Sequence, residues 1–141
     1  MEFKAILLTV TGVVGGFISS IFGGWSTALT TLLMFMVIDY ITGLLVAGLF
    51  HKSNKTTNGA LESNAGFKGL IKKGMALLVV LIGFRLDIMI GTNYIKDAVV
   101  IAFVVNELIS IVENMGLMGI PMPEVITKAI DVLQKNDKTE A

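Results

Sequence analysis

The stretch AVVIAFVVNELISIVENMGLM, residues 98–118, combines a long apolar run with a ladder of polar side chains. The polar positions recur every three or four residues. In a helix they therefore share one stripe, while valine, isoleucine, leucine and phenylalanine cover the opposite side. Such a helix requires two environments, lipid on one side and protein or water on the other. The ladder comprises Asn106, Glu107, Ser110, Glu113 and Asn114.

The composition of the whole chain also indicates a membrane protein. Its 141 residues are 54% hydrophobic and have a mean hydropathy of +0.80, above the usual range of soluble domains. Residues 5–38 contain no charged side chain, whereas about 20 apolar residues already cross a bilayer core. We therefore expect two spans there, separated at Gly23 and Gly24, where a tight turn is permitted. A secretory signal peptide is disfavoured because the apolar run continues into a second segment.

Four membrane-spanning helices are expected in total, at residues 4–22, 26–50, 74–90 and 98–118. Lysines gather in the loop over residues 51–73. Because lysine-rich loops stay on the cytoplasmic side, this loop and both termini are predicted to be cytoplasmic. The predicted fold class is an all-α integral membrane protein.

A transmembrane domain is expected over residues 1–120, followed by a cytoplasmic amphipathic tail over 121–141. Pro121 and Pro123 impose an extended elbow between them, because each ring removes an amide donor and restricts the preceding residue. The tail then shows an apolar stripe that could lie on the membrane or pair with its copies. The stripe consists of Val125, Ile126, Ala129, Ile130 and Leu133.

The second half of the lysine-rich loop has a helical pattern. Apolar residues alternate there with Lys68, Lys72 and Lys73. These lysines are predicted to set the topology or to meet anionic lipid headgroups from an interfacial helix. A plain solvated loop is the alternative that the pattern leaves open.

Charged side chains inside the spans need partners, since one at a helix centre costs roughly 2.5–3.5 kcal/mol. At a rise of about 1.5 Å per residue, Asp39 and Glu107 lie near the midplane, and Arg85 lies close enough for its long side chain to reach Glu107. We predict an Arg85–Glu107 ion pair, which leaves Asp39 and Glu113 without an evident cation. Packing between helices and lining of an aqueous lesion both remain open for the polar groups. The predicted lesion-lining or oligomer contacts are Asp39, Asn106, Glu107, Ser110, Glu113 and Asn114.

Small residues indicate close helix packing at two places. Gly12 and Gly16 form a G-x-x-x-G step in the first span, which serves packing within the chain or self-association equally well. Gly43 follows Asp39 by one turn and keeps that face of the second span small.

The sequence shows no catalytic or metal-binding pattern. It has no cysteine, and its single histidine, His51, stands at a membrane boundary. The formal net charge is zero, so no overall field attracts nucleic acid. We therefore predict a protein that is not an enzyme, that needs no cofactor or metal and that binds no nucleic acid.

Three blocks together resemble the phage holin and toxin-secretion holin family of Gram-positive bacteria and their phages. The main block is NELISIVENMGLMGIPMP, residues 106–123, and the others are DYITG, residues 39–43, and FKGLIKK, residues 67–73. The resemblance covers about residues 36–133. The first helix departs from the family pattern.

The resemblance implies a small protein of the bacterial cytoplasmic membrane that forms homo-oligomers and opens lesions during host lysis. Endolysin, or a large toxin, would then cross to the cell wall. A small ion channel or carrier and a non-conducting membrane scaffold are the alternative functions.

Overall fold

In the part of the chain that the structure describes, the regular secondary structure consists of five α-helices joined by loops. This computed structural model describes residues 1–140, with side chains described through residue 136. The all-α fold class is confirmed. The helices are α1 (Glu2–Ile21), α2 (Thr27–Gly48), α3 (Ser63–Ile90), α4 (Ile95–Leu117) and α5 (Glu124–Glu140).

Local sequence determines where these helices begin and end. The Ser26 hydroxyl oxygen accepts a hydrogen bond of 3.1 Å from the Leu29 amide and so caps the start of α2. α3 ends at Gly91, whose φ of 80° is left-handed and therefore suits glycine. Pro121 and Pro123 lie in the non-helical link between α4 and α5, where a missing amide donor costs nothing.

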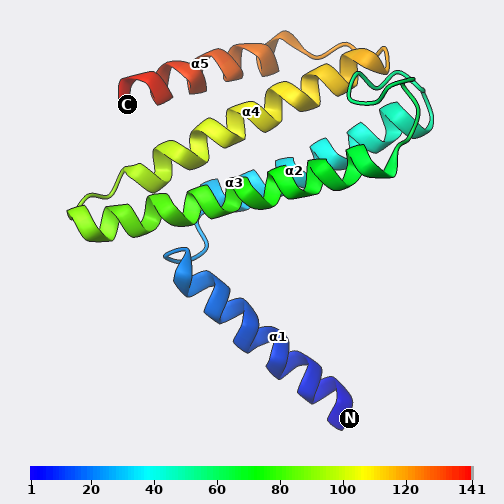
Figure 1. Cartoon of the computed structure of the whole chain (residues 1–141). Coiled ribbons are helices and arrows are strands. Elements are labelled where there is room, and N and C mark those ends of the chain that lie inside the picture. Colours follow the sequence, from blue (N-terminus) through cyan, green and yellow to red (C-terminus); the bar gives the residue numbers. More distant parts are fainter. Residues whose placement is uncertain (141) are drawn as a thin grey trace.

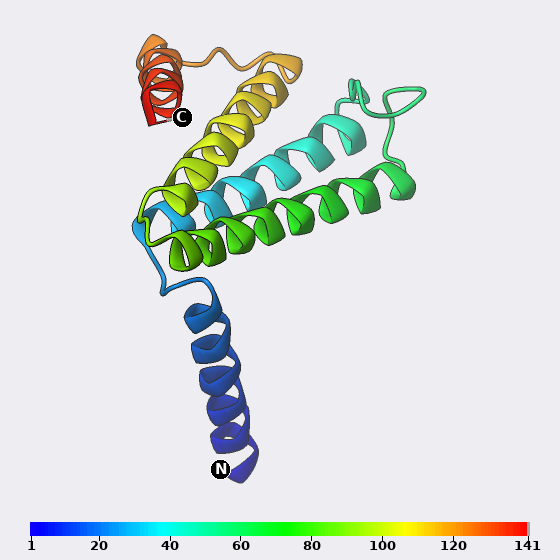
Figure 2. The same cartoon turned by 60° about the vertical axis from the view of Figure 1, so that its left-hand side comes forward.

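Three helices, α2, α3 and α4, lie side by side as a bundle, and α1 leaves it at one end (Figure 1). α2 and α4 pack extensively against each other, α3 packs mainly on α4, and α2 and α3 touch little. Figure 2 shows α3 and α4 diverging from the short turn that joins them. The bundle is therefore closed at that turn and wider at the end that carries the α2–α3 loop.

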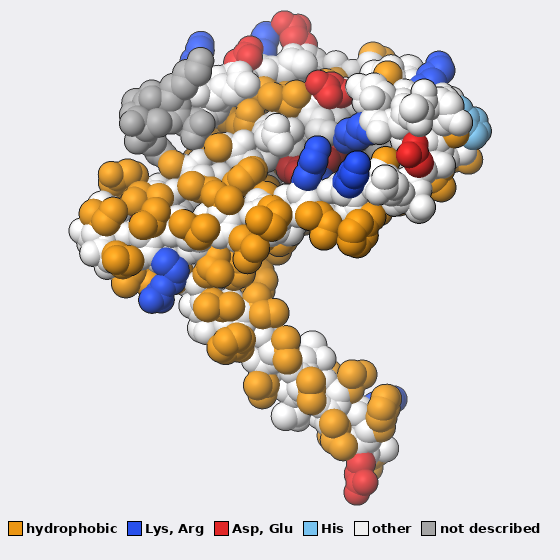
Figure 3. Space-filling model, in the orientation of Figure 1, with side chains coloured by type: hydrophobic (Ala, Val, Ile, Leu, Met, Phe, Trp, Pro, Cys, Tyr) orange, Lys and Arg blue, Asp and Glu red, His pale blue; other side chains and the backbone are white. Residues whose placement is uncertain are grey.

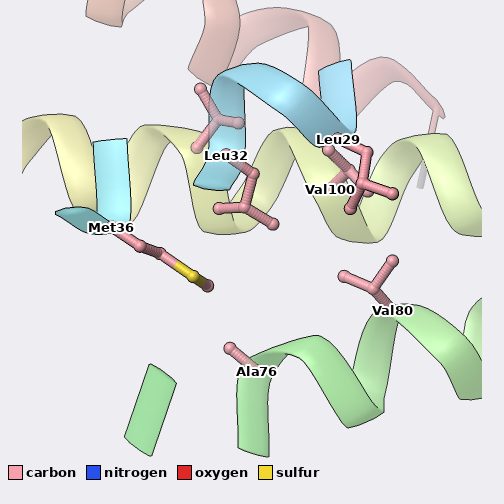
Figure 4. Close-up of a cluster of buried hydrophobic side chains, with 7 residues drawn as sticks. Leu29, Leu32, Met36, Ala76, Val80 and Val100 are labelled. Atoms are coloured by element: carbon pink, nitrogen blue, oxygen red, sulfur yellow. The ribbon is translucent and has the colours of Figure 1, made fainter. Parts of the chain in front are cut away.

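The apolar core lies between these three helices (Figure 4). Leu32, Val80 and Val100 come from different helices and are fully excluded from solvent. Their side chains interlock between the helices, so this cluster helps to fix how the helices associate. Its members are Leu29, Leu32, Met36, Ala76, Val80, Val100 and Val104.

α1 contributes no buried residue to this core. It is joined to α2 through Gly23 and Gly24, which have φ values of 77° and 95°, so the predicted glycine break is confirmed. A Cβ at Gly23 would approach the Phe84 ring to 2.5 Å, and only glycine fits. Nothing lies within 4 Å of a Cβ placed on Gly12 or Gly16. Their packing against another helix stays a prediction.

α3 is longer than predicted. It begins at Ser63 rather than at residue 74, because the segment that carries Lys68, Lys72 and Lys73 contains no helix breaker and continues directly into the apolar part. The helical reading of that segment is confirmed, and the plain loop is excluded. The other three predicted spans agree with α1, α2 and α4 to within three residues.

By length and apolar composition, α1 and α2 are each able to cross a membrane. The predicted spans at α3 and α4 carry more charged residues and are not established on that basis.

The predicted C-terminal helix forms as α5 and turns back along α4 (Figure 2). Ile130 is buried, whereas Val125 and Val132 are exposed. Part of the predicted apolar stripe is therefore used within the chain. The cytoplasmic location of this tail stays a prediction, and residue 141 lies outside the described residues.

Candidate functional site: a charged cluster between three helices

Asp39 of α2, Lys73 of α3 and Glu107 of α4 each lie on the inward-facing stripe of their helix. The buried positions of α3, residues 76, 80, 83 and 87, are three or four apart, and Lys73 precedes the first by three. In the same way, Asp39 follows Met36 in α2, and Glu107 follows Val104 in α4. Since residues three or four apart share one helix face, the three charges point into the bundle.

The three side chains meet in a single ion cluster. The Lys73 Nζ donates to Asp39 Oδ2 at 2.7 Å and to Glu107 Oε2 at 2.6 Å. The exposed fractions of the side chains are 15% for Lys73, 7% for Asp39 and 8% for Glu107. Hydrogen bonds between ionised groups are short and strong, and here one ammonium links all three helices. Two carboxylates share it, so with all three groups ionised the cluster carries one net negative charge.

Asn114, which follows Glu107 by about two turns of α4, extends the cluster. Its amide nitrogen donates to Asp39 Oδ1 at 2.9 Å and to the Thr42 hydroxyl oxygen at 2.8 Å. A Cβ on Gly43 would lie 3.9 Å from the same nitrogen, an ordinary contact distance, so Gly43 faces Asn114 and a role of the missing side chain in close packing stays a prediction. Through these hydrogen bonds, the polar groups of the cluster obtain partners that a lipid environment cannot supply.

A cavity of about 330 Å³ runs from the cluster to the loop between α2 and α3. The cluster residues Asp39, Lys73 and Glu107 line it, and so do Lys55, Thr56 and Lys72. Figure 3 shows blue basic side chains gathered on this face, with red acidic atoms recessed beside them. The charged interior is thus connected to the wider end of the bundle.

The predicted Arg85–Glu107 ion pair is wrong. Arg85 is exposed because it lies between the buried positions 83 and 87 and points away from the core. Glu107 pairs with Lys73 instead. Lys73 was expected at the lipid surface, and that interpretation is corrected too, whereas Lys68 and Lys72 are exposed. Its three-residue spacing from Ala76 is the sequence signal that identifies Lys73 as an interior residue.

The structure divides the polar ladder of α4 between two surroundings. Glu107 and Asn114 are buried, Ser110 is half-buried, and Asn106 and Glu113 are exposed. The contacts of Asp39, Glu107 and Asn114 lie within the chain. The lining of a lesion or of a contact between copies by any ladder residue stays a prediction.

A second group of charges lies at the closed end of the bundle. The Asp87 carboxylate accepts hydrogen bonds from the Thr92 hydroxyl at 2.6 Å and from the Ile95 and Lys96 amides at 3.0 and 2.9 Å. It therefore caps the start of α4. The Lys96 Nζ donates to the Phe22 carbonyl oxygen and lies 5.4 Å from the centre of the Phe84 ring. No sequence-based role was assigned to Asp87 and Lys96.

Comparison with known proteins gives a consistent family description. Residues 16–135 match the bacteriophage holin family. An uncharacterized protein of Listeria monocytogenes is 39% identical over 117 residues, covering 82% of this chain and 78% of the relative. An uncharacterized protein of Clostridium perfringens is 37% identical over 115 residues, with coverages of 80% and 81%.

A protein of Bacillus phage phi105, described as a probable holin, is 30% identical over 115 residues, which cover 79% of each chain. No solved structure matches. None of these descriptions names an enzyme.

Proposed function

The chain belongs to the bacteriophage holin family, and from this membership we propose that it is a holin of the bacterial cytoplasmic membrane. Several copies would associate there and open lesions. Endolysin, its functional partner, would then reach the cell wall without necessarily touching the holin. This role needs neither a catalytic residue nor a cofactor.

We place all of α1 to α4 across the membrane, with both termini and α5 on the cytoplasmic side. The apolar surfaces of α1 and α2 support this arrangement. For α3, the support is that Lys73 and Asp87 have partners inside the bundle, whereas the outward positions include Leu78, Val79 and Ile82. Charges that face neighbouring helices and an otherwise apolar outer side are compatible with lipid. The exposed Arg85 is five residues before Ile90, where its long side chain can extend to the membrane surface.

The ion cluster of Lys73, Asp39 and Glu107 carries the mechanistic part of the proposal. By a rise of 1.5 Å per residue, Asp39 lies about 18 Å from the start of α2 and Glu107 about 18 Å from the start of α4. Both depths fall within a hydrocarbon core of about 30 Å. The cluster would hold one subunit closed, and its polar groups would become available to water when the helices separate.

Contacts between copies would use the surfaces that the fold leaves uncovered. Asn106 and Glu113 are exposed on α4, and Gly12 and Gly16 lie on the uncovered α1. Small residues let helices of different subunits approach closely, and polar side chains seek partners away from lipid.

Induced expression in bacteria tests this function directly. The measurements are the membrane potential and the release of a folded cytosolic enzyme. A sudden depolarisation accompanied by enzyme release is expected of a holin. Ion flux without enzyme release would favour a channel or carrier, and neither effect would favour a scaffold.

Two substitutions in the cluster test its role in the same assay. Asp39→Asn and Glu107→Gln remove one charge each at nearly constant volume, and both should change the time of lysis. Asp97→Asn is the matched control, because Asp97 is exposed in the first turn of α4. Unchanged timing in both cluster variants would contradict the role proposed for these acids.

A further inference from the structure

Two lysines line the cavity without forming an ion pair. Lys55 comes from the α2–α3 loop and Lys72 from α3. Lys73 and Lys128 form the ion pairs found among the described side chains, so the ammonium groups of Lys55 and Lys72 have no carboxylate partner there. Glu62 also lines the cavity, and Asp39 and Glu107 share Lys73. The part of the cavity near the loop therefore carries two lysines against one glutamate.

A hydroxyl group on the same wall is also unsatisfied. Thr56 lines the cavity, and its Oγ1 is buried with no hydrogen-bond partner among the described residues. A buried hydroxyl without a partner costs free energy. An acceptor oxygen brought by a ligand would remove this cost, and the flanking lysines select an anionic ligand.

The depth of these groups matches that of a lipid headgroup. Lys72 is 18 residues before Ile90, so it lies about 27 Å from the far end of α3 at 1.5 Å per residue. In a hydrocarbon core of about 30 Å this position is close to the membrane surface. Phosphate groups of lipids lie at that level.

A mainly apolar groove adjoins the cavity. Tyr40, Leu44 and Leu61 line both spaces, and so do Glu62 and Gly66. The other residues of the groove are Ser63, Phe67 and Leu70. The helices α2 and α3 touch little, so the groove is a gap in the bundle surface. Its apolar lining suits the acyl chains of a molecule whose headgroup enters the cavity.

We propose that this cavity and groove together bind one anionic phospholipid. Lys55, Lys72 and the Thr56 hydroxyl donate to its phosphate oxygens, and the acyl chains lie along Leu44 and then Tyr40 of α2, in the direction away from the α2–α3 loop. Such a lipid fills the wide end of the bundle, where α3 diverges from α4. The proposal concerns the single subunit and does not depend on lesion formation.

The test uses the full-length protein purified in detergent, with phosphatidylglycerol as the probe. Binding is measured by native mass spectrometry, and the melting temperature by circular dichroism. Phosphatidylglycerol should bind and raise the melting temperature. Phosphatidylcholine, with a neutral headgroup, and inorganic phosphate, without acyl chains, should do neither. Equal stabilisation by either of them would overturn the proposal of an anionic lipid site.

Substitutions locate the site. Lys72→Gln and Lys55→Gln should each weaken phosphatidylglycerol binding about tenfold, the effect of losing one hydrogen bond to a charged group. Lys68→Gln is the matched control, since Lys68 is exposed on α3 and does not line the cavity. An equal loss in Lys68→Gln would indicate adsorption to a basic surface and overturn the discrete site.

Thr56→Val separates loss of lipid binding from loss of folding. Because the hydroxyl has no partner in the chain, the lipid-free protein should melt at the same or a higher temperature. Phosphatidylglycerol binding should nevertheless weaken. Full retention of binding in Thr56→Val would remove Thr56 from the site and contradict the proposed contact.

Discussion

The two ends of the helical bundle satisfy buried charges in different ways. At the closed end, Asp87 binds the Thr92 hydroxyl and two amides within nine residues of itself. At the wide end, Lys73 binds two carboxylates that are each 34 residues away. The first site joins neighbours in sequence, and the second joins three helices.

This difference assigns different tasks to the two sites. Asp87 shapes the turn between α3 and α4, which the short connection already keeps together. The cluster around Lys73 joins α2, α3 and α4 next to the apolar core, on the side of the core that faces the α2–α3 loop. Loss of the cluster should therefore affect tertiary structure, and loss of Asp87 should affect one helix end.

The largest effect should follow Lys73→Met. This change leaves two buried carboxylates without a cation, and breaking a buried ion pair costs about 3–5 kcal/mol of unfolding free energy. Denaturant titration of the detergent-purified protein, followed by circular dichroism, measures the loss. Lys68→Met is the control, because Lys68 is exposed on α3 and does not line the cavity. Equal losses of unfolding free energy in the two variants would contradict the claim that Lys73 contributes more to stability than an exposed lysine.

Asn114→Leu should have the next largest effect. It removes the donor to Asp39 Oδ1 and to the Thr42 hydroxyl, and each buried group left unpaired costs about 1–3 kcal/mol. The same titration measures it. Asn106→Leu is the control, since Asn106 is exposed on the same helix. If Asn114→Leu leaves the free energy of unfolding unchanged, the contacts of Asn114 do not contribute to stability, and only the ion pairs of the cluster do.

Asp87→Ala should destabilise the protein by about 1 kcal/mol, the typical cost of losing a helix cap. Amide hydrogen exchange should localise the change to the first turn of α4, with the ion cluster still protected. Asp97→Ala removes another acidic residue from the first turn of α4 and tests whether the loss of any acid there has the same effect as the loss of Asp87. Loss of protection throughout the bundle would mean that both ends maintain the tertiary fold.

Arg85→Leu should have the smallest effect, within about 0.5 kcal/mol, because exposed side chains contribute little. A double-mutant cycle with Glu107→Leu should show no coupling, in contrast to the cycle of Lys73→Met with Glu107→Leu. Strong coupling between Arg85 and Glu107 would support the Arg85–Glu107 ion pair and contradict the pairing of Glu107 with Lys73.

The sequence was sufficient to predict the helices but not the partners of their charges. Apolar runs, the Gly23–Gly24 break and the proline elbow predicted the main elements, because these features act locally. The predicted partner of Glu107 is wrong because the predicted third span begins at residue 74. That boundary places Lys73 in the preceding loop and leaves Arg85 as the nearest cation inside the span. Counting back from Asp87 and Gly83 in steps of three or four reaches Lys73 and passes over Arg85. The approach of α2 to α4 depends on tertiary packing, and no local pattern determines it.

The absence of buried residues in α1 separates the chain into two parts that contribute differently to the fold of one subunit. The bundle must preserve the shapes of its interlocking side chains, whereas α1 need preserve only its length and apolar character. Many substitutions in α1 are therefore equivalent for the folding of a single subunit. The family match, which begins at residue 16, omits most of this helix. Within one subunit, the apolar side chains of α1 can therefore be replaced by other apolar side chains without disturbing the bundle core.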